Sequence, residues 1–190
     1  MRVDFSRLRS RFVELTAARQ RRQPWTVADL QAPRMLAVTV EAAAAGERPA
    51  VLDASALEFE QGQPSTEALA AFAQKLPAAR QRWAVLLPRD AYRLAVMPEP
   101  DVPAAELAQS VRWQLASTLD FPVEDAAVDF LKIPTRELQP ERSPELYVVA
   151  APGEVVRAQA GLFRAARLDL QAIDIRETAQ RNIGALLERD

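Results

Sequence analysis

Short apolar runs, each closed by a proline or a polar turn, divide most of this chain into segments of strand or helix length. After residue 24, runs rich in Val, Leu and aromatic side chains predict three strands, at residues 25–30, 35–40 and 50–54. A helix follows, with Ser65 as its expected N-cap, and ends at Pro77. Residues 83–87 are uninterruptedly apolar, which is typical of a strand buried on both faces. The expected order of this first part is βββαβ.

A second group of elements begins at residue 92. Residues 92–97 alternate as a strand does, and the next helix carries the apolar stripe Leu107, Val111 and Leu115. Two further strands are expected at residues 126–133 and 145–151, joined by a proline-bearing loop, so the local order is strand, helix, strand, strand. The remaining predicted elements are a helix at 155–166, a strand at 168–175 and a closing helix at 179–187.

Two residue types are missing, and their absence removes most catalytic chemistry. The 190 residues include no Cys and no His, which excludes thiol nucleophiles, Ser/His/Asp triads and Cys/His zinc sites. The five glycines form neither a GxGxxG nor a GxxxxGK[ST] phosphate loop. No uncharged stretch exceeds the segment from Leu146 to Gly153, against about 20 apolar residues for a transmembrane helix. A catalytic interpretation would therefore have to rest on Asp or Glu.

Basic charge is concentrated at the amino terminus. Residues 1–22 hold seven arginines against two acids, a net charge of +5, so the remaining residues carry −7 of the total of −2. An apolar stripe at helical spacing runs through this segment, formed by Phe5, Leu8, Phe12 and Leu15. Such a basic amphipathic helix, placed at residues 1–23, would dock on the body of the protein or a neighbouring chain, or make peripheral contact with anionic lipid. Nucleic-acid binding is disfavoured because the body is acidic.

Several segments of the body, taken in order, resemble one known family. They are Val85-Leu-Leu-Pro88, Tyr92-Arg-Leu-Ala-Val-Met-Pro98, Glu106-Leu-Ala-Gln-Ser-Val-Arg-Trp113, Leu119-Asp-Phe-Pro122, Asp125, Asp129-Phe130, Tyr147-Val-Val-Ala-Ala-Pro152, Gly161-Leu162 and Ala172-Ile-Asp174. Their order and spacing resemble the actin-like pilus assembly proteins PilM and MshI over roughly residues 25–188. The tryptophan and the long proline-bearing loop look more like MshI, the assembly protein of mannose-sensitive haemagglutinin (MSHA) pili.

The resemblance implies an α/β fold with a mixed sheet: a ribonuclease-H-like, actin-like ATPase lobe with an inserted strand-helix-strand-strand subdomain. The lobe would comprise residues 24–89 and 169–190, and the insertion residues 90–168. The cytoplasmic domains of GspL-type secretion proteins share this architecture.

The resemblance also locates the segment that would bind nucleotide phosphates. Actin-like ATPases use a hairpin that reads Asp, apolar, Gly, Ser/Thr, and the glycine lets backbone N–H groups approach the anion. Asp29 matches the magnesium-facing acid as a relic of that loop, but Gln31 replaces the glycine and Pro33 removes a donor. We therefore expect no cofactor and no ATP hydrolysis, with weak ATP binding left open for a longer native chain.

Two acidic groups each allow two interpretations. Asp174 and Glu177 have the spacing of a helix capping box, with a catalytic carboxylate pair as the alternative. Asp120, Glu124 and Asp125 suggest a solvated acidic turn, with a hard-cation site as the alternative. We expect the cap and the turn, hence no catalytic and no metal-binding residues.

Two neighbouring residues of the predicted helix at 101–120 are candidates for partner binding. At 100° per residue Trp113 points away from the stripe of Leu107 and Val111. Either another part of the protein covers it, or it contacts a partner, as tryptophans often do at interface hot spots. Arg112 beside it could hold a carboxylate of that partner.

The family resemblance implies a function. It is that of a non-catalytic, cytoplasmic scaffold at the inner face of the bacterial inner membrane, in type IV pilus biogenesis. The implied partners are the cytoplasmic tail of a PilN-like inner-membrane protein and other pilus assembly components, with peptide capture in a groove or on a sheet edge. The alternatives are an actin-like ATP-binding protein or ATPase, and a GspL-like scaffold of type II secretion.

Overall fold

The structure is a computed structural model that describes residues 23–41, 49–60, 62–77, 81–133 and 143–187. The chain forms two compact units. The first unit comprises Met1–Arg89 and Ala158–Asp190, and the second comprises Asp90–Arg157. The predicted helix at residues 1–23 and most of the predicted loop at 134–144 lie outside the described residues. Among the described helices none is both long and apolar enough to cross a membrane.

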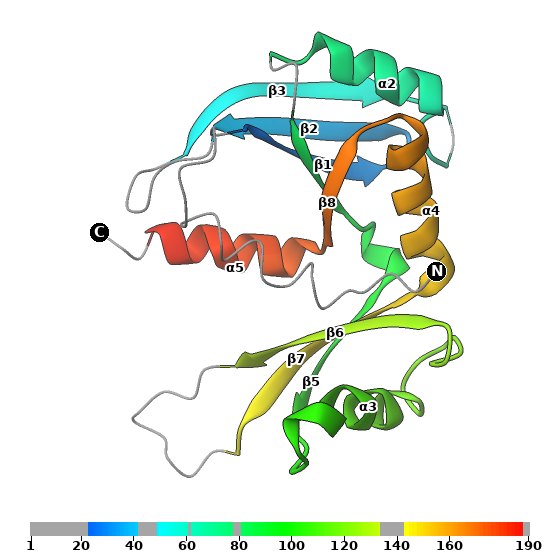
Figure 1. Cartoon of the computed structure of the whole chain (residues 1–190), viewed down its shortest axis with the longest axis vertical. Helices are drawn as coiled ribbons and strands as arrows, with labels where there is room; N and C mark the ends of the chain where they lie inside the picture. Colours follow the sequence, from blue (N-terminus) through cyan, green and yellow to red (C-terminus); the bar gives the residue numbers. More distant parts are fainter. Residues whose placement is uncertain (1–22, 42–48, 61, 78–80, 134–142, 188–190) are drawn as a thin grey trace. The chain divides into compact units, whose positions relative to one another are not determined.

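The first unit is built on a five-stranded mixed sheet, the first sheet (Figure 1). Its strands are β1 (Trp25–Gln31), β2 (Arg34–Glu41), β3 (Ala50–Glu58), β4 (Arg82–Leu86) and β8 (Asp169–Asp174). Their order across the sheet is β3-β2-β1-β4-β8. Strand β2 is antiparallel to β1 and β3, whereas β4 is parallel to both β1 and β8. The carboxyl ends of β1, β4 and β8 therefore meet at one edge.

One face of the first sheet carries the main core. Helix α2 (Thr66–Lys75) and helix α4 (Gly153–Ala165) contribute Leu69, Phe72 and Phe163 to this core. The Phe163 ring meets the Trp83 ring edge-on, with centroids 5.7 Å apart. Helix α2 begins where predicted, because the Ser65 hydroxyl accepts a hydrogen bond from the Ala68 N–H at 3.1 Å.

The other face of the first sheet is only partly covered. Trp25, Ala84 and Ala172 form a small buried cluster there, and helix α5 (Arg176–Leu187) lies on this side of the sheet, opposite α2 (Figure 1). Over β2 and β3 the face stays exposed and apolar. We call this part the open face; it consists of Leu36, Val38, Val51, Ala54 and Ala56.

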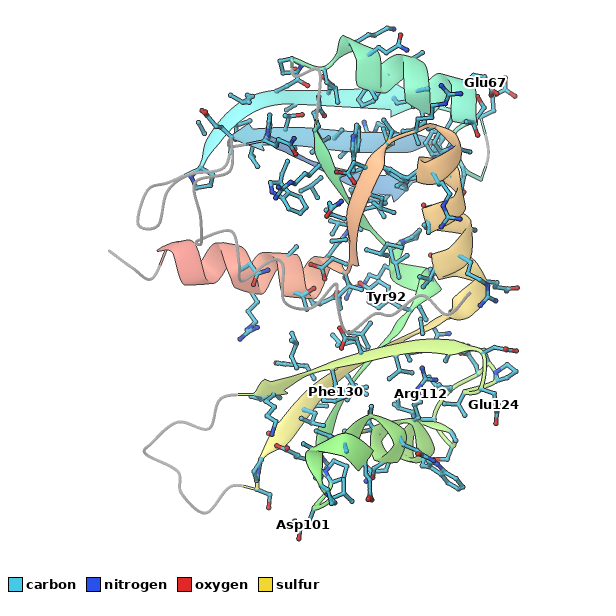
Figure 2. All side chains as sticks on the ribbon, in the orientation of Figure 1. Glu67, Tyr92, Asp101, Arg112, Glu124 and Phe130 are labelled. Atoms are coloured by element: carbon cyan, nitrogen blue, oxygen red, sulfur yellow. The ribbon has the colours of Figure 1, made fainter. Side chains whose placement is uncertain are left out.

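The second unit has its own sheet and its own core. Strands β5 (Arg93–Pro98), β7 (Glu145–Pro152) and β6 (Ala126–Ile133) form an antiparallel sheet in that order, the second sheet. Helix α3 (Ala104–Leu115) packs on one face through Leu107, Val111 and Leu115. Figure 2 shows Phe130 of β6 between the sheet and this helix, where it joins the core.

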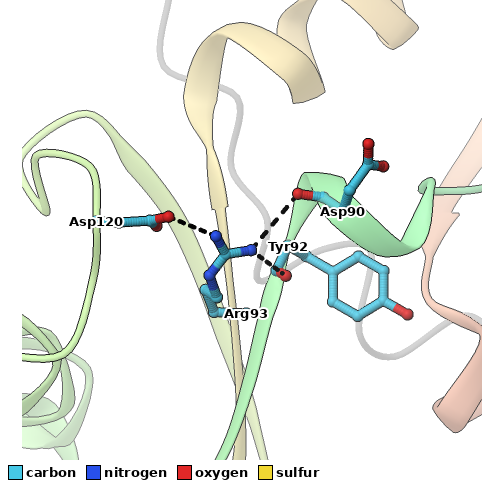
Figure 3. Close-up of polar contacts among 4 residues, drawn as sticks. All are labelled: Asp90, Tyr92, Arg93 and Asp120. Carbon is cyan, nitrogen blue, oxygen red and sulfur yellow. Dashed lines mark hydrogen bonds and ion pairs between the residues drawn. The ribbon is translucent and has the colours of Figure 1, made fainter.

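A short 3-10 turn (Arg89–Ala91) leads into β5, and the Arg93 side chain contacts residues on both sides of the start of this strand. Its Nη1 donates to the carbonyl oxygens of Tyr92 at 3.2 Å and Asp90 at 3.5 Å. Its Nη2 forms an ion pair with Asp120, just beyond α3 (Figure 3). The start of β5 is thereby fastened to the loop that follows α3.

The predicted order of elements is confirmed, with differences in extent. β3 continues to Glu58 rather than ending at residue 54, because it pairs with β2 as far as Arg34. The second unit ends at Arg157 rather than at residue 168. The reason is that Phe163 and Ala166, near the end of α4 and beyond it, pack into the core of the first unit.

Candidate functional site

The carboxyl edge of the parallel strands brings two acidic residues into one row. Asp29 of β1 is level with Leu86 of β4, and Leu86 is level with Asp174 of β8. Residues that are level across neighbouring strands point to the same face, so both carboxylates lie on the side of the sheet where α5 lies. In open α/β sheets, ligands bind at this edge.

Asp29 is neutralised from within the chain. The Nη2 atom of Arg176, the first residue of α5, lies 2.9 Å from each carboxylate oxygen of Asp29. The Gln31 side-chain amide donates to the same carboxylate at 2.7 Å. Burial raises the pKa of Asp29, and the charge and hydrogen bond of Arg176 partly oppose that rise. In this structure a guanidinium therefore holds the acid that was predicted to be a relic of a magnesium-facing residue.

The turn that would carry the phosphates is hydrogen-bonded to the residue that follows β3. β1 and β2 are joined through Ala32 and Pro33, whose peptide bond is cis, and the Pro33 carbonyl accepts a hydrogen bond from the Phe59 N–H at 2.8 Å. Gln31, at the position of the missing glycine, directs its amide to Asp29. Neither residue offers the backbone approach that a glycine would give to an anion.

Asp174 differs from its predicted role as the N-cap of α5. It is the last residue of β8, and its carbonyl accepts a hydrogen bond from the Leu87 N–H at 2.9 Å, so the strand continues through this residue. Helix α5 begins at Arg176, which places the N-cap position at Ile175. The Asp174 carboxylate accepts hydrogen bonds from the Ile175 N–H, at 2.8 Å, and from the Thr178 hydroxyl. Burial raises the pKa of Asp174, while these two hydrogen bonds oppose the rise.

The predicted partner of Asp174 in a carboxylate pair, Glu177, has a cation nearby. The Nη2 atom of Arg89 lies 4.0 Å from a Glu177 carboxylate oxygen. The interactions of Asp174 are instead with Ile175 and Thr178. Each acid thus has contacts of its own in this part of the first unit.

The acidic turn of the second unit has contacts of its own as well. Asp120 forms an ion pair with Arg93 (Figure 3), and the Asp125 carbonyl accepts the Gly153 N–H at 2.9 Å. Among the described residues no three acidic side chains lie close enough together to hold a metal ion.

Trp113 lies as the helical spacing predicts. It is 75% exposed on α3, while Leu107, Val111 and Leu115 of the same helix are buried, so its outward orientation is confirmed. Arg112 has a different position from the one expected for a residue that holds a partner. It is half-buried beside the turn that carries Glu124 (Figure 2), and its Nη1 donates to the carbonyls of Val123 at 3.1 Å and Ala126 at 3.0 Å. Arg112 therefore connects α3 to the turn before β6 within its own unit.

The structure adds a surface that the sequence reasoning did not identify as a site. Val96 of β5 is level with Tyr147 of β7, and Leu94 is level with Val149, so these side chains share the face of the second sheet opposite α3. Leu94, Val96 and Tyr147 are 39%, 52% and 40% exposed. We call these three residues the outer face. The signal in the sequence was that both sets of alternating residues in β5 are largely apolar, which means that each face of this strand needs a cover.

β5 also has one side without a partner strand among the described residues, because it pairs only with β7. An edge strand presents a row of backbone N–H and C=O groups to which an extended peptide can add. The outer face and the β5 edge together have the features of a peptide-binding surface.

Several solved structures are similar to this chain, and three of them are described here by their similarity to it. A PilM-PilN type IV pilus biogenesis complex matches with a TM-score of 0.66 and 23% sequence identity, covering 83% of this chain and 48% of that chain. The cytoplasmic domain of EpsL, an inner-membrane component of the type II secretion system of Vibrio cholerae, matches with a TM-score of 0.58 and 17% identity, covering 80% and 57%. A Bacteroides thetaiotaomicron protein with an actin-like ATPase fold has a TM-score of 0.39 at 7% identity, covering 80% and 52%.

The first two likenesses identify a mixed α/β fold, and the chain spans about half the length of the structures it matches. No curated protein matches it. The family model described as type IV pilus assembly protein PilM matches residues 30–189, which include the whole second unit and the first unit apart from residues 1–29 and residue 190. The chain therefore belongs to the PilM family of type IV pilus assembly proteins.

Proposed function

We propose that this chain is a non-catalytic scaffold of type IV pilus biogenesis, acting at the cytoplasmic face of the inner membrane. It would bind the cytoplasmic tail of a PilN-like inner-membrane protein. The observation that supports this most strongly is the likeness, over 83% of the chain, to a PilM protein whose structure is a complex with PilN. Within the family, the tryptophan and the long proline-bearing loop, which look more like MshI, favour the MSHA-type branch.

The surface we propose for the tail is the β5 edge with the outer face beside it. Backbone groups along an unpaired edge supply affinity for an extended peptide, and alternate side chains supply specificity. Leu94 and Val96 point from β5 toward the same side as Tyr147, so a tail with apolar residues at every second position would match them.

A non-catalytic role fits the chemistry of the first unit. In an ATPase of this fold the acid corresponding to Asp29 would face a metal ion, but here Arg176 neutralises it. The turn at Ala32 and Pro33 has no glycine with which to hold a phosphate.

Calorimetry with a synthetic PilN-like tail peptide tests the proposal. We expect micromolar binding to the full chain, and a loss of at least tenfold in affinity for Leu94→Asp, since a charge is placed against an apolar contact. Val38→Asp is the matched control, because Val38 is 38% exposed and belongs to the first sheet. An equal loss in both variants, or no heat at high micromolar peptide, would contradict the proposal.

Nucleotide binding is the second candidate, and the position of Asp29 and Asp174 at the carboxyl edge is the observation in its favour. A ligand that binds only the folded state raises the melting temperature. We expect an unchanged melting temperature in millimolar MgATP. A concentration-dependent rise that disappears in Asp29→Asn would establish this second function.

Secretion is the third candidate, favoured by the likeness to the EpsL cytoplasmic domain. Tail peptides from type II secretion partners, titrated beside the PilN-like peptide, separate the two scaffolds. We expect the pilus peptide to bind more tightly.

A further inference from the structure

The described residues leave the open face of the first sheet only partly covered. Leu36 and Val38 of β2 are 40% and 38% exposed, and Val51 of β3 is 66% exposed, although α5 lies on the same side of the sheet. Ala54 and Ala56 continue the apolar surface on β3, because they are level with Val38 and Leu36. An apolar surface of this kind usually contacts another part of a protein.

The two strands of the open face carry a net negative charge, although Asp53, level with the buried Thr39, points to the opposite side of the sheet. In residues 34–60, four carboxylates, those of Glu41, Asp53, Glu58 and Glu60, are described, and the only described cation is Arg34. A partner for this surface should therefore be apolar on the side that touches the sheet and basic at its margins.

Residues 1–22 of the same chain have these properties. They carry a net charge of +5 and the helically spaced stripe Phe5, Leu8, Phe12 and Leu15. As a helix, residues 3–17 would be about 22 Å long, close to the length of an eight-residue strand such as β2. The length and the charge of this segment both match the open face.

The chain connection brings the segment to the right place. β1 begins at Trp25, which is level with Val40 of β2, and Val40 pairs with Val51 at the end of the open face. Residues 18–23 can reach up to about 20 Å when extended. Because the segment is tethered, its docking is intramolecular and needs only modest affinity.

We propose that residues 1–22 dock on the open face as a basic amphipathic helix, with the stripe against Leu36, Val38 and Val51. This contact covers apolar surface of the first sheet and brings the arginines to two strands whose described residues carry a net negative charge. The proposal is independent of the binding of a PilN-like tail, which uses the second unit.

A distance measurement between two spin labels tests the proposal in the full chain. The chain contains no cysteine, so Ser10→Cys and Ala50→Cys give two defined attachment sites. Ser10 is on the side of the predicted helix opposite the stripe, and Ala50 is exposed at the start of β3. We expect a single narrow distance distribution, unchanged when labelled protein is diluted with an excess of unlabelled protein.

Two variants identify the contact. Val38→Asp should broaden the distribution, whereas Leu94→Asp, of matched exposure in the second sheet, should not. Phe12→Asp changes only the segment and should broaden the distribution as much as Val38→Asp does, which keeps the test valid if Val38→Asp perturbs the fold.

Four outcomes would overturn the proposal. A broad distribution in the unaltered full chain would show that the segment does not dock. Loss of the narrow distance on dilution would assign the open face to a second copy. A distribution that narrows only with vesicles containing anionic lipid would assign the segment to a membrane. Equal broadening by Leu94→Asp would show that the effect is not specific to the open face.

Discussion

The two sheets of this protein each bury one face and leave apolar residues exposed on the other, yet they differ in chemistry at the exposed side. The first sheet combines its open face with charged groups at the carboxyl edge, where Asp29 and Arg176 neutralise one another. The outer face of the second sheet is apolar at Leu94, Val96 and Tyr147 and adjoins the edge of β5, which has no partner strand in the described part of the chain. In the first sheet an internal ion pair therefore occupies the edge where open α/β sheets bind ligands, whereas the second sheet presents apolar side chains beside a strand edge.

Each unit has a hydrophobic core of its own, and truncation of core side chains tests the independence of the two cores most strongly. Trp83→Ala in the first unit should destabilise that unit by about 3–5 kcal/mol, and Leu146→Ala in the second should cost its own unit about 2–5 kcal/mol. Both side chains are at most 2% exposed. Hydrogen exchange after each substitution should show faster exchange mainly in the unit that carries it. Equal acceleration in both units would show one cooperative core.

The internal ion pair should give the next largest effect. Arg176→Ala leaves the Asp29 carboxylate without its cation, and the side chains of Arg176 and Asp29 are only 29% and 20% exposed. We expect a loss of about 1–3 kcal/mol in the free energy of unfolding, measured in urea. Asp29→Asn should cost less, because it removes the charge that needs compensation. A double-mutant cycle isolates the pairwise energy, and additive single effects would contradict a direct pair.

The acids at this edge also predict how stability depends on pH. Burial raises the pKa of Asp174 above its unfolded value near 3.8, so the folded state binds more protons than the unfolded state above that pH. The contribution of Asp174 to stability therefore falls as the pH rises from about 3.8 through its folded pKa. Asp174→Asn should remove this slope and change stability at neutral pH by less than about 1.5 kcal/mol. Urea unfolding at several pH values measures the slope, and an unchanged slope in the variant would contradict the effect of burial.

The sequence predicted the elements better than the contacts between them. The strand patterns, the Ser65 cap and the outward position of Trp113 depend on local periodicity and hydrogen bonding, which neighbouring residues determine. The pair between Asp29 and Arg176 joins residues 147 positions apart, and no local pattern encodes such a pairing. The hydrogen bonds of Arg112 are nonlocal in the same way, because its acceptors, the carbonyls of Val123 and Ala126, lie in a turn beyond its own helix.

Replacement of Trp113 should have the smallest effect on stability, so it distinguishes a loss of partner binding from a loss of folding. Because its side chain is 75% exposed, Trp113→Ala should change the free energy of unfolding by no more than about 0.5 kcal/mol. If Trp113 contacts a pilus assembly partner, the same substitution should weaken that complex by about 2 kcal/mol or more, as truncated hot-spot tryptophans do. Binding of the PilN-like tail to the β5 edge should stay unchanged, since Trp113 is on α3, which packs on the face opposite Leu94. Loss of tail affinity in Trp113→Ala would instead extend the peptide site to α3, so that both sides of the second sheet would take part in binding the tail.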